Sequence, residues 1–180
     1  MLKFIFIFFI LVNSAISKEV VLTCISKCRG NFKDCLEANR AEIKKGIKEE
    51  KVINHFLAQK LDTYTITPDK RLYWSVGDKS LGKQKILLFE NDKFYIFISS
   101  ATFKEKNPRG AYAEFYTIID RINLKLVEKE IFLNERKIIP WGDEELVDFA
   151  YNSIDRYIKY PYDEEVNGKT CELKNLYPKF

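Results

Sequence analysis

A long stretch of alternating apolar and polar residues restricts the fold of this sequence more than any other feature. From Thr63 onward the pattern has a period of two, with Leu72, Trp74 and Val76 at every second position. Residues at i and i+2 lie on one face of a strand, and aromatic and β-branched residues favour strands. Further strands are predicted at 86–89, 94–98, 111–119 and 125–133. The turns at 90–93 and 120–123 join them into an antiparallel meander of about five or six strands.

Two stretches have a helical period instead. Apolar residues between 31 and 61 recur at three- and four-residue spacing, which predicts one or two amphipathic helices. Gly46 marks a kink or a break there, because glycine weakens a helix by about 1 kcal/mol relative to alanine. A further helix is predicted over 143–158, with three acidic residues in its first turn and Pro161 after its end.

The chain closes with one more predicted strand. Asn167-Gly168 is typical of a turn, and 170–173 would follow it as a short strand that carries Cys171. The predicted fold class is therefore α+β. We expect an antiparallel β-meander or partial barrel, with an N-terminal helical segment and a C-terminal helix packed on it.

The N-terminal end has the order of a cleavable signal peptide. Lys3 precedes an unbroken apolar run at 4–12, and the small residues Ala15 and Ser17 suit a cleavage site. The run is nine residues long, whereas a helix needs about 20 to cross a bilayer. We therefore expect cleavage between Ser17 and Lys18, which leaves one domain, 18–180, without a membrane span.

The charge balance of the chain gives a weak indication of its partners. The 30 basic and 26 acidic side chains give a net charge of +4, and removal of 1–17 lowers it to +3. This small excess predicts no nucleic-acid partner. Abundant Lys, Ile, Asn and Phe are typical of an AT-rich genome. The protein would be periplasmic in a Gram-negative bacterium and secreted otherwise.

Four cysteines in an exported chain predict two disulfides. Cys24 and Cys28 would be about 13 Å apart on an extended strand, too far for a bond. The turn at Arg29-Gly30-Asn31 can bring Cys28 to Cys35, which leaves Cys24 for Cys171. Pairing of Cys24 with Cys35 and of Cys28 with Cys171 stays open as the alternative. The spacings fit neither a redox motif nor a zinc site.

Groups that carry catalysis are scarce. His55 is the single histidine, so Ser-His-Asp and Cys-His mechanisms are excluded. The acidic residues at 143–145 are explained by the start of a helix, and glycosidase carboxylates would face each other from different elements. No phosphate-binding loop is present. We expect no cofactor and no metal, and the scarcity of catalytic groups argues against an enzyme.

Tyrosines near the end of the last helix are a candidate surface. Tyr160 and Tyr162 lie close to Arg156 and Lys159, an arrangement that suits sugar stacking or contact with a protein. The alternative is that these aromatic side chains belong to the core and its rim.

Two resemblances extend this interpretation. The strand Leu22-Thr23-Cys24 and the C-terminal Thr170-Cys171-Glu172 resemble the ends of small uncharacterised exported proteins of AT-rich bacteria, over about half of the chain. That resemblance implies a location in the cell envelope. The cysteine arrangement is also similar to exported lysozyme-inhibitor barrels, with Arg109-Gly110-Ala111-Tyr112 as the related loop, which implies a protein-binding site around Arg109 and Tyr112.

The function expected from the sequence is therefore that of a non-enzymatic exported protein. It would bind an unknown protein or a small ligand in the envelope. The alternatives are a lysozyme-inhibitor-like protein, or a hydrolase with an unrecognised carboxylate or tyrosine site.

Overall fold

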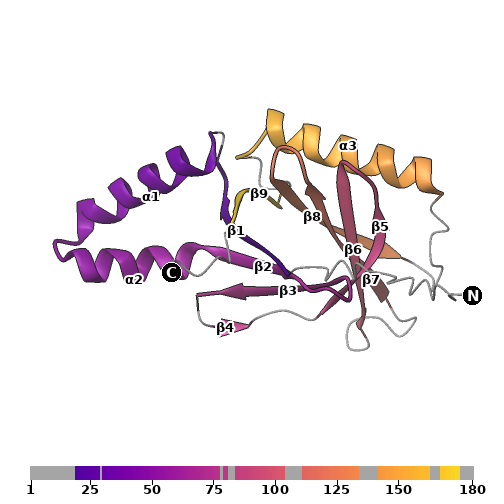
Figure 1. Cartoon of the computed structure of the whole chain (residues 1–180), viewed down its shortest axis with the longest axis horizontal. Coiled ribbons are helices and arrows are strands. Elements are labelled where there is room, and N and C mark those ends of the chain that lie inside the picture. The colour runs from indigo at the N-terminus through magenta and orange to yellow at the C-terminus, as the bar shows by residue number, and fades with distance from the viewer. Residues whose placement is uncertain are drawn as a thin grey trace, which may run out of the picture.

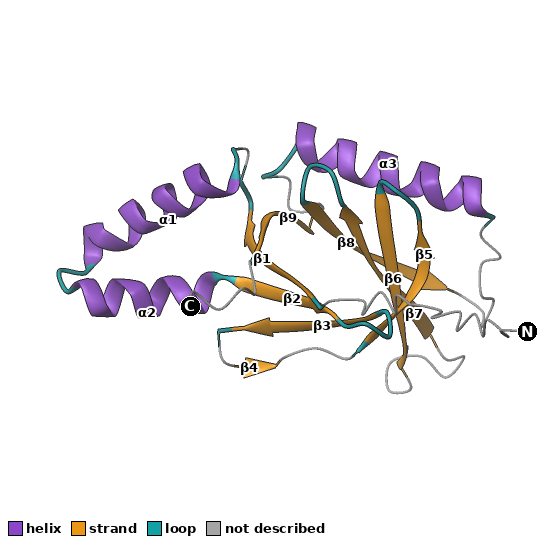
Figure 2. Ribbon diagram, viewed as in Figure 1, coloured by secondary structure: helices purple, strands orange, loops and turns teal. Residues whose placement is uncertain are grey.

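The computed structural model describes residues 19–28, 30–77, 79–80, 84–103, 111–133, 142–162 and 167–174. Within these ranges the chain forms nine strands and three helices (Figure 1, Figure 2). In chain order the elements are β1 (Val20–Ser26), α1 (Phe32–Gly46), α2 (Glu50–Lys60), β2 (Asp62–Ile66), β3 (Arg71–Val76), β4 (Lys79–Ser80), β5 (Lys85–Glu90), β6 (Phe94–Phe103), β7 (Ala111–Asp120), β8 (Lys125–Leu133), α3 (Asp143–Lys159) and β9 (Asn167–Leu173).

Eight of the strands form a closed antiparallel barrel. Their order is β2-β1-β9-β8-β7-β6-β5-β3, and a further pairing between β2 and β3 joins the two ends of this row. The two-residue β4 adds to the edge of β3, outside the ring. Closure pairs each of these eight strands with a neighbour on both sides over at least part of its length.

The predicted fold class was wrong. The sheet is a closed barrel and the protein is mostly β, whereas we expected a meander or a partial barrel with an N-terminal helical segment packed on it. The ring depends on contacts between segments far apart in the chain, such as β1 with β2, which pair from Val20↔Ile66 to Cys24↔Asp62 although α1 and α2 separate them. Such long-range pairing leaves no mark on the local period of a sequence.

The helices at 31–61 are a hairpin that projects from one end of the barrel (Figure 1). Helix α1 begins after Asn31, whose side-chain Oδ1 accepts a hydrogen bond from the Asp34 N–H. It ends at Gly46, at the predicted break. Ile43 of α1 packs with Ile53 and Leu57 of α2, so the two helices bury a small core of their own.

Helix α3 lies along the outside of the barrel (Figure 1). Its buried face, with Leu146, Ala150, Ile154 and Tyr157, packs on outward-facing side chains of β6, β7 and β8. A second cluster fills the inside of the barrel and consists of Leu22, Cys24, Tyr64, Ile66, Leu72, Phe97, Ile119, Leu126 and Cys171. The core therefore has two layers on opposite sides of the same strands.

The prediction of a turn at Asn167-Gly168 was wrong, because both residues belong to strand β9. A Cβ on Gly168 would lie 2.1 Å from Cδ2 of Tyr157. The buried ring of Tyr157 therefore lies directly on this backbone position, and its hydroxyl lies 3.1 Å from both the Cys28 carbonyl oxygen and Thr170 Oγ1. The glycine is needed for close packing of α3 on the barrel.

Two disulfides are present, Cys24–Cys171 and Cys28–Cys35, which is the pairing that the sequence ranked first. The first joins directly opposed residues of β1 and β9 inside the barrel. The second joins the end of the first strand to the first turn of α1. Disulfides of this kind are compatible with an oxidising compartment.

Within the described part of the chain, no helix combines the length and the apolar character needed to cross a bilayer.

Candidate functional site

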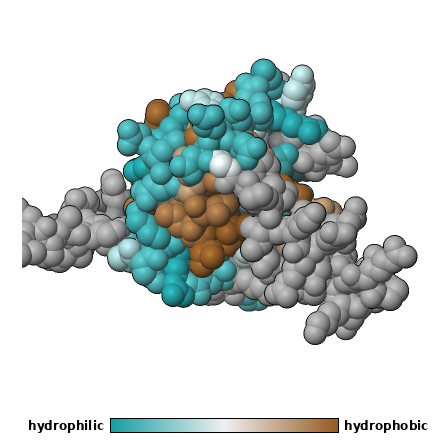
Figure 3. Space-filling model, turned by 90° about the vertical axis from the view of Figure 1, so that its right-hand side faces the viewer, coloured by the Kyte–Doolittle hydropathy of each residue, from teal (hydrophilic) through white to brown (hydrophobic). Residues whose placement is uncertain are grey.

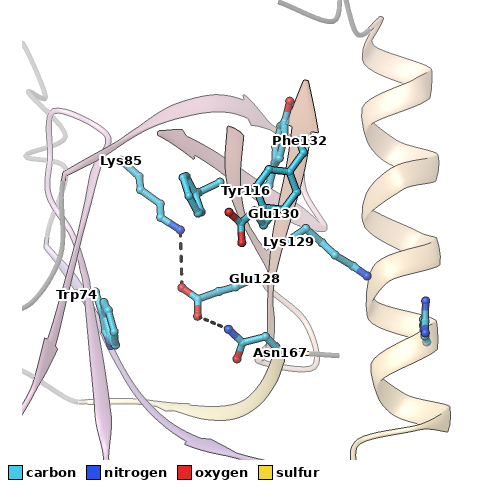
Figure 4. Close-up of a pocket in the computed structure, with 10 residues that line it drawn as sticks. Trp74, Lys85, Tyr116, Glu128, Lys129, Glu130, Phe132 and Asn167 are labelled. Carbon is cyan, nitrogen blue, oxygen red and sulfur yellow. Dashed lines mark hydrogen bonds and ion pairs between the residues drawn. The ribbon is translucent and has the colours of Figure 1, made fainter. Parts of the chain in front are cut away.

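The barrel wall is incomplete at one end, and a cavity lies there. Strands β3 and β5 pair only at Arg71↔Ile86 and Leu72↔Lys85, and β8 pairs with β9 only over 125–128. Beyond these pairs the strands separate and enclose a half-open space of about 680 Å³. Side chains of β3, β5, β7, β8 and β9 line it, together with Arg156 of α3. Lys129 and Glu130 of β8 add further charges to this lining (Figure 4).

The floor of this space is a cluster of buried charges around Lys169. Its side chain is 4% exposed, and its Nζ lies 3.1 Å from Asp62 Oδ2 and 3.0 Å from Glu128 Oε2. The same ammonium donates a hydrogen bond to the Tyr64 hydroxyl. Its three N–H directions therefore have three partners, all of them inside the barrel.

Lys85 and Glu128 form the part of the cluster that lies at the cavity. Their side chains are 16% and 19% exposed, and Lys85 Nζ lies 3.7 Å from Glu128 Oε1 (Figure 4). Lys85 also donates to Thr117 Oγ1 at 2.5 Å. On the other side, Glu128 Oε2 accepts from Asn167 Nδ2 at 3.1 Å. These contacts orient the Glu128 carboxylate so that its Oε1 lies on the side of the cavity.

Aromatic side chains form the walls. Trp74 lies on the β3 side, and its indole N–H donates to Asp62 Oδ1 at 3.0 Å. Its ring is stacked with Tyr64, with centroids 6.5 Å apart. Phe115 and Phe132 stand on the β7 and β8 side. The cavity therefore combines an ionic floor with apolar walls, the usual composition of small-molecule sites.

Burial changes the protonation chemistry of two groups in the cluster. It lowers the pKa of the Lys85 amine, an effect that the nearby Glu128 charge partly offsets and Lys169 strengthens. It raises the pKa of the Tyr64 hydroxyl far above its ordinary value, and the negative charges of Glu128 and Asp62 raise it further. Tyr64 therefore stays protonated and neutral in the folded protein.

The sequence analysis missed this cluster, although a signal was present. Asp62 lies two residues before Tyr64, Lys169 two before Cys171, and Glu128 two after Leu126. Each charged residue thus shares the inward face of its strand with a core residue. A charged residue at an inward position on an otherwise apolar strand face is the sequence pattern that could have identified this cluster.

The residues predicted as sites lie elsewhere or outside the described residues. Tyr160 and Tyr162 follow the end of α3 and are 59% and 57% exposed, so they belong to the surface. Tyr112 lies in β7 opposite Leu133, at the end of the barrel that holds the cavity, and only its backbone is described. Arg109 and the expected cleavage site at Ser17 and Lys18 are not among the described residues.

Two other surfaces of the barrel are weaker candidate sites. A smaller cavity of about 200 Å³ at the opposite end of the barrel is lined mainly by apolar side chains, together with Arg121. An apolar patch faces the viewer in Figure 3, on the side where β5 runs, and Ile86 and Leu88 of β5 are 58% and 41% exposed. Neither surface combines charge and enclosure as the barrel mouth does.

Among the described residues, no group of three or more His, Cys, Asp or Glu side chains could hold a metal ion. Comparison of the chain with protein-family models, with curated proteins and with solved structures found no match, so its function is inferred from its own residues.

Proposed function

We propose that this chain is an exported, non-enzymatic protein that binds a small ligand in the mouth of its barrel. The observation that carries the proposal is the half-open cavity of about 680 Å³ with Lys85 and Glu128 at its floor and Trp74 in its wall. An eight-stranded barrel is wide enough to hold one small ligand.

The energetics of the floor support a binding role. Two cations and two carboxylates lie inside the barrel, where apolar residues of the same size would be at least as stabilising. The cluster therefore needs a reason other than stability. Recognition of a polar group on a ligand is such a reason, since a few well-placed polar side chains give a pocket its specificity.

Export is the second part of the proposal. It is supported by the signal-like residues at 1–17, by the two disulfides and by the resemblance to exported proteins of AT-rich bacteria. The ligand would then be a component of the envelope or of the surrounding medium, in the periplasm of a Gram-negative bacterium or outside the cell.

The test is a screen of small molecules against the oxidised protein, residues 18–180, by thermal shift and ligand-detected NMR. Phe132→Ala removes a wall of the cavity, and Ile122→Ala is its matched control, because both side chains are 68% exposed. We expect a ligand whose binding is weakened by Phe132→Ala and unchanged by Ile122→Ala. Absence of any ligand, or equal binding by both variants, would contradict the proposal.

A protein partner is the second candidate. Ile86 and Leu88 expose neighbouring apolar surface on β5, as partner-binding surfaces often do (Figure 3). Ile86→Ser combined with Leu88→Ser should then abolish capture of the partner from an envelope extract and leave small-molecule binding intact. Equal capture by this double variant and by the parent protein would argue against a partner at β5.

A further inference from the structure

We infer that the ligand of the barrel mouth is a small zwitterion, an α-amino acid with an apolar side chain. This inference rests on the proposed function and specifies the chemistry of the same site. It follows from the charge balance of the floor, from the hydrogen-bonding capacity left at the cavity and from the apolar walls.

The charges at the floor compensate one another. Lys85 and Lys169 compensate Asp62 and Glu128, so these four side chains sum to zero, while Lys129, Glu130 and Arg156 line the cavity elsewhere. At the floor, an ionic group without an opposite charge on the same ligand would disturb this balance in a partly buried space, which is costly. A ligand with no net charge adds no such cost.

The inference uses the hydrogen-bonding capacity of two groups at the floor, the Lys85 ammonium and the Glu128 carboxylate. Lys169 is saturated by Tyr64, Asp62 and Glu128. Lys85 uses one N–H on Thr117, and its distance of 3.7 Å to Glu128 Oε1 exceeds that of a charge-assisted hydrogen bond. The Lys85 ammonium and Glu128 Oε1 therefore form a long ion pair at the cavity, in which each group can accept a closer contact from a ligand (Figure 4).

An α-amino acid has the complementary groups. Its carboxylate and ammonium are attached to one carbon atom, so they can reach Lys85 Nζ and Glu128 Oε1 together. Each contact is then a charge-assisted hydrogen bond, about twice as strong as a neutral one. A neutral polar ligand would gain less from the same two side chains.

The walls select the rest of the ligand. Trp74 stands on one side of the cavity and Phe132 on the other (Figure 4), and Phe115 of β7 also lines it. An aliphatic or aromatic side chain that projects from the α-carbon would lie between these rings and exclude water from them.

The experiment uses free phenylalanine, leucine, methionine and tryptophan as probes in isothermal titration of the oxidised protein. We expect binding of at least one with a Kd below about 1 mM. Three blocked forms of the tightest probe test the charges: the N-acetyl acid lacks the ammonium, the amide lacks the carboxylate and the N-acetyl amide lacks both. Each should bind at least about tenfold more weakly.

A variant gives the converse test. Lys85→Met removes the partner of the carboxylate and should make the amide the preferred ligand over the free amino acid, which a general loss of structure cannot do. Equal binding of the free and doubly blocked forms would overturn the inference while the proposed function stands. Failure of all four probes would also overturn it, and failure of the wider screen would remove the proposed function as well.

Discussion

Replacing Lys169 by methionine would show how strongly the buried cation holds the inner end of the barrel together. Removing one partner of a buried ion pair costs about 3–5 kcal/mol, because the other charge stays buried without compensation. Here Asp62 keeps the hydrogen bond from Trp74, and Glu128 keeps the one from Asn167. Methionine also fills most of the vacated volume. We therefore expect a loss of about 3 kcal/mol in the free energy of unfolding.

The assay is urea unfolding of the oxidised protein, followed by circular dichroism, with a thermal scan as a second measure. A loss of 3 kcal/mol in a domain of this size lowers the Tm by about 6–12 °C. The control is a triple variant that adds Asp62→Asn and Glu128→Gln, which removes the two unpaired charges and should recover more than half of the loss. A change below about 1 kcal/mol for Lys169→Met, or a triple variant no more stable than the single one, would refute the reasoning.

Three further predictions concern packing, cross-links and pH. Gly168→Ala should lower stability by about 3 kcal/mol, because its Cβ would overlap the Tyr157 ring, whereas Gly46→Ala, with nothing within 4 Å, should stabilise by up to about 1 kcal/mol in the same urea assay. Alanine at both cysteines of Cys24–Cys171, which closes the longer loop, should lower the free energy of unfolding in urea by about 5 kcal/mol. The same change at Cys28–Cys35, whose residues are seven apart, should lower it by about 2 kcal/mol. Equal losses would contradict the argument that a longer closed loop gives more stabilisation. Burial raises the pKa of Tyr64 and Tyr157, so the folded state keeps protons that the unfolded state releases. Stability should therefore fall as the pH rises above about 10, by up to about 1.4 kcal/mol per pH unit for each tyrosine, and Tyr64→Phe should make that fall less steep.

The local parts of the fold could be predicted from the sequence. The strand at 125–133 and the start of the last helix at Asp143 are found where the alternation and the acidic first turn place them. The break after Gly46 is also where the loss of helix propensity predicts it. These features depend on neighbouring residues, which a single sequence displays directly.

Barrel closure and the role of Gly168 could not be predicted in this way. Closure requires β1 to pair with β2 across an inserted helical hairpin and β9 to enter between β1 and β8. Asn167-Gly168 has the composition of a turn, yet the ring of Tyr157 fixes it in a strand. In both cases residues far apart in the chain decide the local structure.

The candidate site could not be predicted from the sequence for the same reason. Asp62, Lys85, Glu128 and Lys169 lie on four different strands and are far apart in the sequence. Their meeting depends on the register of the closed barrel. The sequence analysis instead placed its candidate sites near the chain ends and in the loop at Arg109, because aromatic and cysteine residues give stronger sequence signals than single charged residues.

The position of β9 sets an order of assembly on an exported chain. This strand, the last in the sequence, fills the space between β1 and β8 and brings both Lys169 and Cys171. A polypeptide that emerges from a membrane N-terminus first can form the hairpin of α1 and α2 early, but its barrel stays open until the final residues have passed. A chain stopped before Asn167 would present two unpaired edges, β1 and β8, each able to pair with another chain. If the chain is exported as proposed, complete translocation is thus a condition for the closed barrel.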